Sequence, residues 1–316
     1  MTFGTVLVTG GSGLLGLEIT KHLAMNGLNV ISTYNKSLPN FKHPLVTFRH
    51  LDILDTLQLV EILEKCSHVI HCAAIVSFSR YKRNEMFETN VLGTKNLVDC
   101  MLKFNDKKLV HISSVAALGR SDGKIITENS MWSDGHPHTY YAKTKHLAEL
   151  EVFRGIEEGL DATILNPSVI LAPPSGDRTS GKLINYVKKG AYFYPKGFLN
   201  AVDARDVANA AFLALQKNTG EARITLNGFR ISYQEFFSLV SKRLSKRTPN
   251  IPTNQFLNIV VWMIDSLFCL FTKKEPLITK ETLQLSKRDY VYQLKNKELL
   301  EIQFRDMENT LDWCCQ

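Results

Sequence analysis

A glycine-rich segment near the N-terminus constrains the fold of this chain most. Residues 6–16 read VLVTGGSGLLG, so an apolar strand pattern runs into closely spaced glycines and then into a helical pattern. Glycines at such a turn let the backbone approach a pyrophosphate, and the helix N-terminus supplies free N–H groups. Gly11, Gly13 and Gly16 fit the spacing G-x-G-x-x-G. With Gly10 in place of Gly11 the spacing becomes G-x-x-G-x-x-G, so the segment predicts a dinucleotide site and leaves its class open.

Strand and helix patterns alternate through the first half of the chain. Short apolar strands are predicted at residues 5–10, 29–34, 46–52, 68–74, 108–114 and 161–167. Helices are predicted between them, at residues 14–27, 56–65, 84–104 and 139–158. Repeated βα units of this length indicate a parallel sheet with helices on both faces and right-handed connections. The predicted fold class is α/β, a Rossmann-type doubly wound parallel sheet.

The regular alternation fades after about residue 172. A Pro/Gly/Ser-rich loop pattern covers 172–181, a further α/β unit covers 201–216, and the pattern from about 229 is mostly helical. We therefore predict a dinucleotide-binding lobe made of residues 1–172 and about 198–228. A smaller, mainly helical substrate lobe is predicted from about 173–197 and 229–316.

The charge and cysteine patterns exclude several classes of function. The 316-residue chain has a net charge of +7, but its basic residues are scattered in short runs, as on solvated helix faces rather than on a nucleic-acid surface. Its six cysteines form no C-x-x-C pair, and His136 and His138 have no further ligand nearby, so we expect reduced thiols and no bound metal. These features favour a cytoplasmic protein that binds a small molecule.

A membrane-spanning protein is not expected. The N-terminus has no basic segment before a long apolar core, which argues against a signal peptide. The most apolar later stretch, residues 256–271, is 16 residues long and contains Asn258 and Asp265, so it is too short for a membrane span. A core helix is favoured, and a helix that lies on a membrane surface is the alternative.

The end of the second predicted strand indicates which dinucleotide is bound. An acidic residue there would bond the ribose 2′-hydroxyl of NAD and repel the 2′-phosphate of NADP. The strand ends instead in Tyr34, Asn35 and Lys36, with no acidic residue. We predict that Lys36 meets the 2′-phosphate and that NADP is preferred. The alternatives are an ordinary solvated lysine and NAD as the cofactor.

A tyrosine and a lysine on one predicted helix indicate the chemistry. Tyr141 and Lys145 are four residues apart, so they share a helix face. A tyrosine has an ordinary pKa of about 10, and a nearby lysine cation is expected to lower it. Tyr140 has only Thr144 at the same spacing and is expected to be structural. Upstream, Ser113 and Ser114 end a predicted strand, where a hydroxyl can orient a substrate carbonyl.

Taken together, these motifs resemble the extended short-chain dehydrogenase/reductase family. The matches are TGGSGLLG, HCAA after the fourth strand, ETNVLGTKNL, the serine-ended strand, Y-x-x-x-K, NPSVILAP and VDARDVA. The resemblance selects the spacing of Gly10, Gly13 and Gly16. It implies an NAD(P)-dependent enzyme that acts on a CH–OH or C=O group, and a homodimer formed through two helices of the cofactor lobe.

The resemblance also implies roles for individual residues. The implied catalytic set is Ser114, Tyr141 and Lys145, supported by Asn90. The implied cofactor site comprises Gly10, Gly13, Leu14, Leu15, Gly16, Tyr34, Asn35, Lys36, Asp52, Ile53, Ala73, Ala74, Lys145, Pro167, Ser168 and Val169. Asp206 matches a family position but is interpreted as a helix N-cap with a structural role.

Departures from the family pattern narrow the expected substrate. Val115 and Ala116 occupy the places where nucleotide-sugar dehydratases carry an Asp-Glu pair. Leu118-Gly119 stands where sugar-processing members often have Tyr-Gly, although Asn166 could still bond a nucleotide. The apolar character favours the branch of dihydroflavonol reductases and 3β-hydroxysteroid dehydrogenases, and hence hydride transfer to or from a small, fairly apolar substrate. A nucleotide-sugar epimerase and a non-catalytic cofactor-binding protein are the alternatives.

Overall fold

A computed structural model describes residues 4–104, 106–120, 125–136, 138–174, 181–217, 223–253 and 290–316. A seven-stranded parallel sheet forms its centre, with the strand order β11-β7-β5-β4-β1-β2-β3. This sheet confirms the predicted doubly wound α/β fold. The strands are β1 (Val6–Thr9), β2 (Val30–Tyr34), β3 (Val46–His50), β4 (His68–His71), β5 (Lys108–Ile112), β7 (Asp161–Pro167) and β11 (Arg223–Leu226).

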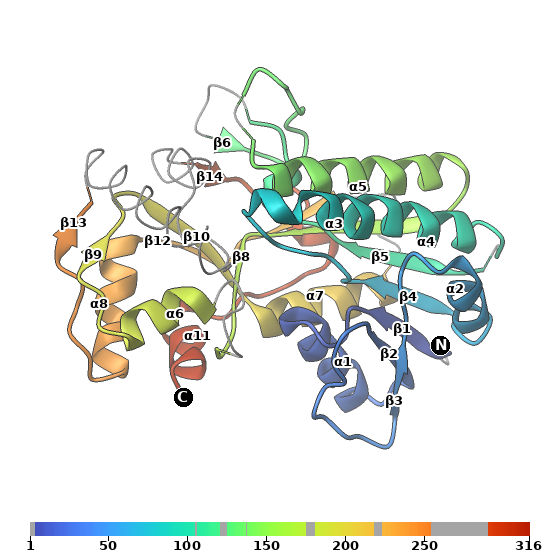
Figure 1. Ribbon diagram of the computed structural model, residues 1–316, viewed down its shortest axis with the longest axis horizontal. Coiled ribbons are helices and arrows are strands. Elements are labelled where there is room, and N and C mark those ends of the chain that lie inside the picture. The colour runs from blue at the N-terminus through green and yellow to red at the C-terminus, as the bar shows by residue number, and fades with distance from the viewer. Residues whose placement is uncertain are drawn as a thin grey trace.

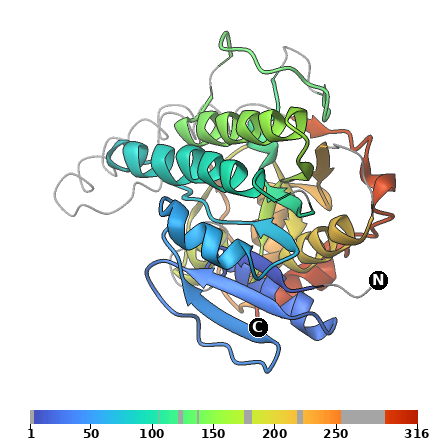
Figure 2. The same ribbon diagram turned by 90° about the vertical axis from the view of Figure 1, so that its right-hand side faces the viewer.

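Helices cover both faces of this sheet because successive strand side chains point to opposite faces. Val6 and Val8 pack on one face with helices α1 (Leu14–Met25) and α7 (Ala204–Gln216). Leu7 packs on the other face, where α2 (Thr56–Leu63), α4 (Gly93–Met101) and α5 (Tyr140–Glu157) lie (Figure 1). Figure 2 shows α4 in teal and α5 in green alongside each other.

The helix predicted over residues 84–104 is divided into three parts. It comprises the short helix α3 (Arg83–Phe87), a π-helical turn at Glu88–Leu92 and then α4, which ends at Met101. A π turn inserts an extra residue into the helical repeat and is frequent at functional sites. Here the π turn contains Asn90, one of the predicted site residues, and buries it.

A second group of elements has its own apolar core, which includes Phe236, Phe237 and Leu311. A three-stranded sheet in the order β12-β10-β8 lies here, with helices α6, α8 and α11. Residues from 229 thus begin with a strand rather than a helix, and the apolar stretch 256–271 lies outside the described residues. The elements of this group are β8 (Val169–Leu171), α6 (Gly181–Lys188), β10 (Phe198–Asp203), β12 (Phe229–Ser232), α8 (Tyr233–Arg243) and α11 (Met307–Cys314). Two further pairs of short strands are β9 (Phe193–Tyr194) with β13 (Ile251–Pro252), and β6 (Ile125–Ile126) with β14 (Val291–Tyr292).

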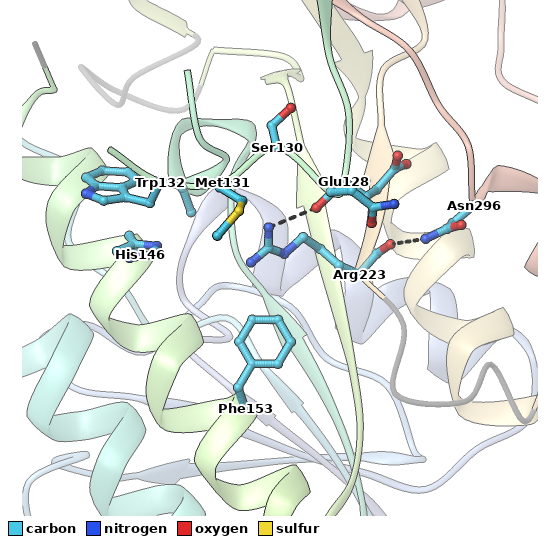
Figure 3. A pocket seen from close by; sticks show the side chains of 10 residues that line it. Glu128, Ser130, Met131, Trp132, His146, Phe153, Arg223 and Asn296 are labelled. Carbon is cyan, nitrogen blue, oxygen red and sulfur yellow. Dashed lines mark hydrogen bonds between the residues drawn. The ribbon is translucent and has the colours of Figure 1, made fainter. Parts of the chain in front are cut away.

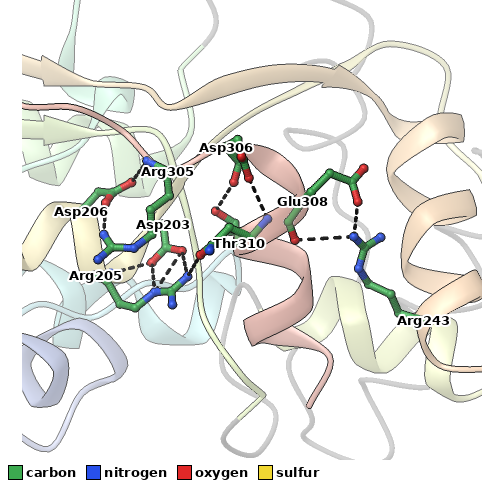
Figure 4. A network of polar contacts seen from close by, with 9 residues as sticks. Asp203, Arg205, Asp206, Arg243, Arg305, Asp306, Glu308 and Thr310 are labelled. Atoms are coloured by element: carbon green, nitrogen blue, oxygen red, sulfur yellow. Dashed lines mark hydrogen bonds and ion pairs between the residues drawn. The ribbon is translucent and has the colours of Figure 1, made fainter.

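Ion pairs fasten the C-terminal segment to the rest of the molecule (Figure 4). Asp206 accepts a hydrogen bond from the backbone N–H of Arg305 at 2.8 Å and pairs with its guanidinium group. The prediction that Asp206 caps helix α7 was wrong, because Asp203 is the cap and accepts from the N–H of Arg205 at 2.8 Å. Asp206 lies in the first turn and is free to reach the C-terminal segment.

Within the described residues, no helix is long and apolar enough to cross a membrane.

Candidate active site

The carboxyl ends of the parallel strands bring most of the predicted site residues to one edge of the sheet. The glycine loop follows β1, Tyr34 ends β2, and Ala73 lies just beyond β4. Ser114 follows β5, and Pro167 ends β7. Ligands of open α/β sheets bind in the crevice outside these strand ends. The arrangement therefore places the cofactor residues and the serine on the same side.

Close contacts surround the glycines of the loop. Gly10 has φ +70°, and a Cβ atom there would lie 2.8 Å from the Cα atom of Ala73. A Cβ atom on Gly16 would lie 2.3 Å from the carbonyl oxygen of Gly10. The N–H of Gly13 donates to that same oxygen at 2.9 Å. Gly10, Gly13 and Gly16 thus form the turn, whereas Gly11 faces the hydroxyl of Ser32.

The start of helix α1 fits a pyrophosphate group. Gly13 is its N-cap and, among the described residues, receives no side-chain cap; the first turn, with Leu14 and Leu15, contains no acidic residue. Helix N-terminal N–H groups carry partial positive charge and bind anions where no side chain competes. The loop and helix together have the donor set and the backbone closeness that a dinucleotide requires.

A chain of buried hydrogen bonds joins the ends of β1 and β4 to helix α4. The Thr9 hydroxyl accepts from the N–H of Ala73 at 3.2 Å and contacts His71 Nδ1 at 2.7 Å. On the other side of the ring, His71 Nε2 lies 3.0 Å from the Thr94 hydroxyl, which donates to the carbonyl of Asn90 at 2.7 Å. Thr94 has used its hydrogen, so His71 Nε2 carries the ring proton and Nδ1 accepts from Thr9. Burial lowers the pKa of His71 to about 3, which keeps this ring neutral.

Thr9, His71 and Thr94 were not predicted from the sequence. The signal that could have found them is a polar residue at the end of each of two buried neighbouring strands, where its side chain requires a partner.

Asn90 connects the segment after β4 to helix α5. Its Oδ1 accepts from the N–H of Ile75 at 2.7 Å, and its Nδ2 donates to the carbonyl of Ile75 at 3.0 Å. The same Nδ2 donates to the Thr144 hydroxyl at 3.0 Å. Asn90 therefore fixes both Ile75, just past Ala74, and the helix that carries Tyr141. Its contacts are those of a supporting residue.

Ser114 and Tyr141 meet at the start of α5. Thr139 caps this helix by accepting from the N–H of Ala142 at 3.0 Å. The Ser114 hydroxyl accepts from the N–H of Ala116 at 3.1 Å and forms a hydrogen bond with the Tyr141 side chain. Burial raises the pKa of Tyr141 to about 12, and the bond to Ser114 opposes this rise. The expected lowering of this pKa by Lys145 is thus overturned, because burial dominates.

Lys145 lies one turn further along α5 and is buried. Its ammonium group donates to the carbonyl of Ile112 at 2.7 Å. Burial lowers the pKa of Lys145 to about 8, and the carboxylate of Glu149 opposes this effect. Lys145 is therefore a cation at neutral pH, close to the strand end that leads to Ser114.

The side of the cleft predicted for adenosine has a charged border. Tyr34 packs edge-to-face on His50. The ammonium group of Lys36 lies 3.0 Å from Glu85 Oε1, and Lys82 lies 2.5 Å from the other carboxylate oxygen. Glu85 is thus shared by two lysines, which leaves the cluster with a net positive charge.

The remaining predicted site residues follow the carboxyl ends of β2, β3 and β7. Asp52 Oδ1 accepts from the N–H of Leu54 at 3.0 Å, and Ile53 packs closely against Gly93. Asn35 is exposed. Past Pro167, the buried Ser168 donates its N–H to the carbonyl of Leu226 at 2.9 Å, and Val169 is exposed.

A cavity of about 550 Å³ lies elsewhere, beside α5 and the β11 edge (Figure 3). Its lining contains none of the predicted site residues. It comprises Ala117, Glu128, Asn129, Ser130, Met131, Trp132, His146, Phe153, Arg223 and Asn296.

Comparisons with known proteins agree with this geometry. Residues 6–227 match the model of the NAD dependent epimerase/dehydratase family. A sterol-4-alpha-carboxylate 3-dehydrogenase, decarboxylating, of Dictyostelium discoideum is 25% identical and covers 90% of this chain and 91% of its own length. Cinnamoyl-CoA reductase 2 of Arabidopsis thaliana is 26% identical over 75% of this chain and 76% of its own length. The fold is also similar to that of UDP-glucose 4-epimerase from Thermotoga maritima, with a TM-score of 0.79, 19% identity and coverage of 98% and 97% of the two chains.

Proposed function

Because this chain belongs to the NAD dependent epimerase/dehydratase family, and is thus an NAD(P)-dependent enzyme acting on CH–OH or C=O groups, we propose that it reduces the carbonyl group of a small apolar substrate with NADPH. The observation that carries this proposal is the arrangement on α5, where Tyr141 lies one turn before the buried Lys145, together with the position of Ser114 at the end of β5. The test is oxidation of NADPH by purified protein in the presence of a panel of apolar ketones and aldehydes.

The three side chains have distinct roles in this reaction. NADPH supplies the hydride that adds to the carbonyl carbon. Ser114 donates a hydrogen bond to the carbonyl oxygen, where negative charge develops. Tyr141 transfers its phenolic proton to that oxygen as a general acid. Lys145 places a positive charge near the tyrosine, which stabilises the phenolate that remains, and its ammonium group would bond the ribose of a bound cofactor.

The raised pKa of Tyr141 fits the role of proton donor in carbonyl reduction. A tyrosine with a pKa of about 12 holds its proton at pH 7 and can donate it to a new alkoxide. Oxidation of an alcohol would need the phenolate, which is scarce at that pH. Reduction is therefore proposed as the direction for which this site is prepared.

An apolar substrate is supported by the residues that follow Ser114. Val115 and Ala116 offer no acid or base for an elimination, and Leu118 is fully buried. The names of the cinnamoyl-CoA reductase and sterol dehydrogenase relatives indicate that the cinnamoyl group or the sterol, which is apolar, carries the reacting group in those enzymes. We therefore place the substrate among apolar carbonyl compounds rather than nucleotide sugars.

Replacement of Lys36 by methionine is expected to weaken NADPH binding about tenfold, since one charged contact with the 2′-phosphate would be lost. NADH binding should change little, because NADH has no 2′-phosphate. Fluorescence titration with each nucleotide measures both constants. Lys65→Met is the control, because this lysine pairs with Glu61 at the end of α2, which is the opposite edge of the sheet. Equal or tighter binding of NADH by the unaltered protein would refute the preference.

Activity is expected to fall as the pH rises through about 8, where Lys145 loses its proton. Below this pH the lysine is charged and can stabilise the phenolate of Tyr141; above it this support is lost. The pH dependence of kcat/KM for carbonyl reduction measures the basic limb.

The fall in kcat/KM at high pH cannot result from unfolding driven by the deprotonation of Lys145. The pKa of Lys145 is lower in the folded protein than its ordinary value of 10.5, so between about pH 8 and 10.5 the unfolded chain binds more protons. The contribution of Lys145 to stability therefore increases with pH in that window. Thermal unfolding across the same range separates the two effects, and a kcat/KM that stays level to pH 10 would contradict the role of Lys145.

A further inference from the structure

We propose that Glu149, held by Asn166 and Arg223, is a positioning residue that fixes the backbone of Ser114 and places a negative charge one helical turn from Lys145. This inference rests on the proposed function, because it concerns the same Ser114, Tyr141 and Lys145.

Glu149 is a fully buried carboxylate one turn beyond Lys145 on α5. Its Oε1 accepts from Asn166 Nδ2 at 2.6 Å, and its Oε2 lies 2.9 Å from Arg223 Nη2. Taking a carboxylate out of water is costly unless a cation and hydrogen bonds compensate for it. The burial of Glu149 with both kinds of partner indicates a built arrangement rather than a chance surface pair.

Asn166 connects Glu149 to Ser114. It lies on β7 and is fully buried, and its Nδ2 also donates to the carbonyl of Ser114 at 3.0 Å. The carboxylate of Glu149 therefore orients an amide that holds the residue at the end of the neighbouring strand. The Nδ2 atom of Asn166 is thus used by two protein partners.

Arg223 anchors the outer end of the network at the edge strand β11 (Figure 3). Its Nη1 donates to the carbonyl of Glu128 at 3.0 Å, and its own carbonyl accepts from Asn296 Nδ2 at 2.9 Å. The Phe153 ring lies 5.1 Å from the guanidinium group. Burial raises the pKa of Glu149, and the charge of Arg223 opposes this rise. Arg223 thus favours the ionised form of the carboxylate.

Glu149 is the main negative group that acts on Lys145 within the described part of the chain. The other titratable groups near the ammonium are Tyr141 on α5, His71 on β4, His111 on β5 and Cys72 after β4. Burial lowers the pKa of both imidazoles and raises the pKa values of the Tyr141 phenol and the Cys72 thiol to about 12, so all four are neutral at pH 7. Loss of the Glu149 charge should therefore lower the pKa of Lys145 further.

The test is the replacement Glu149→Gln, which keeps the shape and an oxygen for Asn166 but removes the charge. The titration midpoint of Lys145, followed through its ¹³Cε NMR signal and assigned with Lys145→Met, is expected to move down by about one pH unit. The basic limb of kcat/KM for carbonyl reduction should move with it. Glu151→Gln is the matched control, because it removes the same charge from the same helix but from a surface pair with Arg154.

Arg223→Met provides a second variant if Glu149→Gln does not fold. Without the Arg223 cation, Glu149 should become protonated, so the titration midpoint of Lys145 should again move down. The double variant with Glu149→Gln and Arg223→Met should have the same midpoint as Glu149→Gln alone. A midpoint in Glu149→Gln that equals that of the unaltered protein, or lies above it, would overturn the inference. If neither the unaltered protein nor any variant reduced a carbonyl compound, but the NMR midpoint of Lys145 still shifted in Glu149→Gln, only the proposed function would be contradicted.

Discussion

Tyr141→Phe is expected to lose nearly all carbonyl reduction while it binds NADPH as before. The phenylalanine ring keeps the packing of α5 but has no proton to donate, and a general acid contributes about 10²- to 10⁴-fold to the rate. The fall should therefore appear in kcat. Steady-state oxidation of NADPH and a fluorescence titration with NADPH measure the two quantities.

The neighbouring tyrosine provides the control for this variant. Tyr140 lies under the guanidinium group of Arg83, 5.0 Å from ring to cation, and has no proposed part in the chemistry. Tyr140→Phe should therefore retain most of the activity. If Tyr141→Phe retained a substantial fraction of kcat, the assignment of the general acid would be wrong.

Gly16→Ala is expected to weaken NADPH binding by tenfold or more, a loss of at least about 1.4 kcal/mol. The added Cβ atom would lie 2.3 Å from the carbonyl oxygen and 2.8 Å from the carbonyl carbon of Gly10. These are backbone atoms and cannot rotate aside, so the loop that should cradle the pyrophosphate must open. Overpacking of this kind also costs about 1–3 kcal/mol of stability. Titration with NADPH and unfolding in urea measure the two effects.

Gly27→Ala separates loss of stability from loss of binding. Gly27 follows helix α1 with φ +79°, and no atom of the described structure lies within 4 Å of an added Cβ. Alanine in this backbone conformation costs about 1–2 kcal/mol but leaves the glycine loop unchanged. Gly27→Ala should therefore lose stability and keep its affinity for NADPH. Normal NADPH affinity in Gly16→Ala would show that the cofactor does not rest on this loop.

The sheet and the Tyr141–Lys145 pair could be predicted because both depend on local patterns. Strands that alternate with helices lead to a parallel order, and two residues four apart on a helix share a face whatever surrounds them. The spacing of the glycines remained ambiguous in isolation. The structure shows that Gly10, with its positive φ, and Gly11, beside Ser32, both lack room for a side chain, so the spacing stays a prediction from the resemblance.

The pKa of Tyr141 and the network around Glu149 could not be predicted, because they depend on contacts between distant segments. Burial, which the sequence does not reveal, reverses the expected shift of Tyr141. Glu149 meets Arg223 across a separation of more than seventy residues, and the guanidinium group comes from an edge strand without a recognisable motif. The π turn at Asn90 likewise interrupts a segment whose helical pattern is continuous in the sequence.

Deuterium transfer from the cofactor tests the central claim most directly. Purified protein would be incubated with NADPH that carries two deuterium atoms at C4 of the nicotinamide. The panel of apolar ketones and aldehydes would be tested in parallel with a set of nucleotide sugars, and the products would be analysed by mass spectrometry. A reductase that works as proposed should place one deuterium on the carbinol carbon for each NADPH oxidised. Isomerisation of a nucleotide sugar without net loss of NADPH would identify an epimerase, and tight cofactor binding without any turnover would identify a binding protein. Either result would contradict the account.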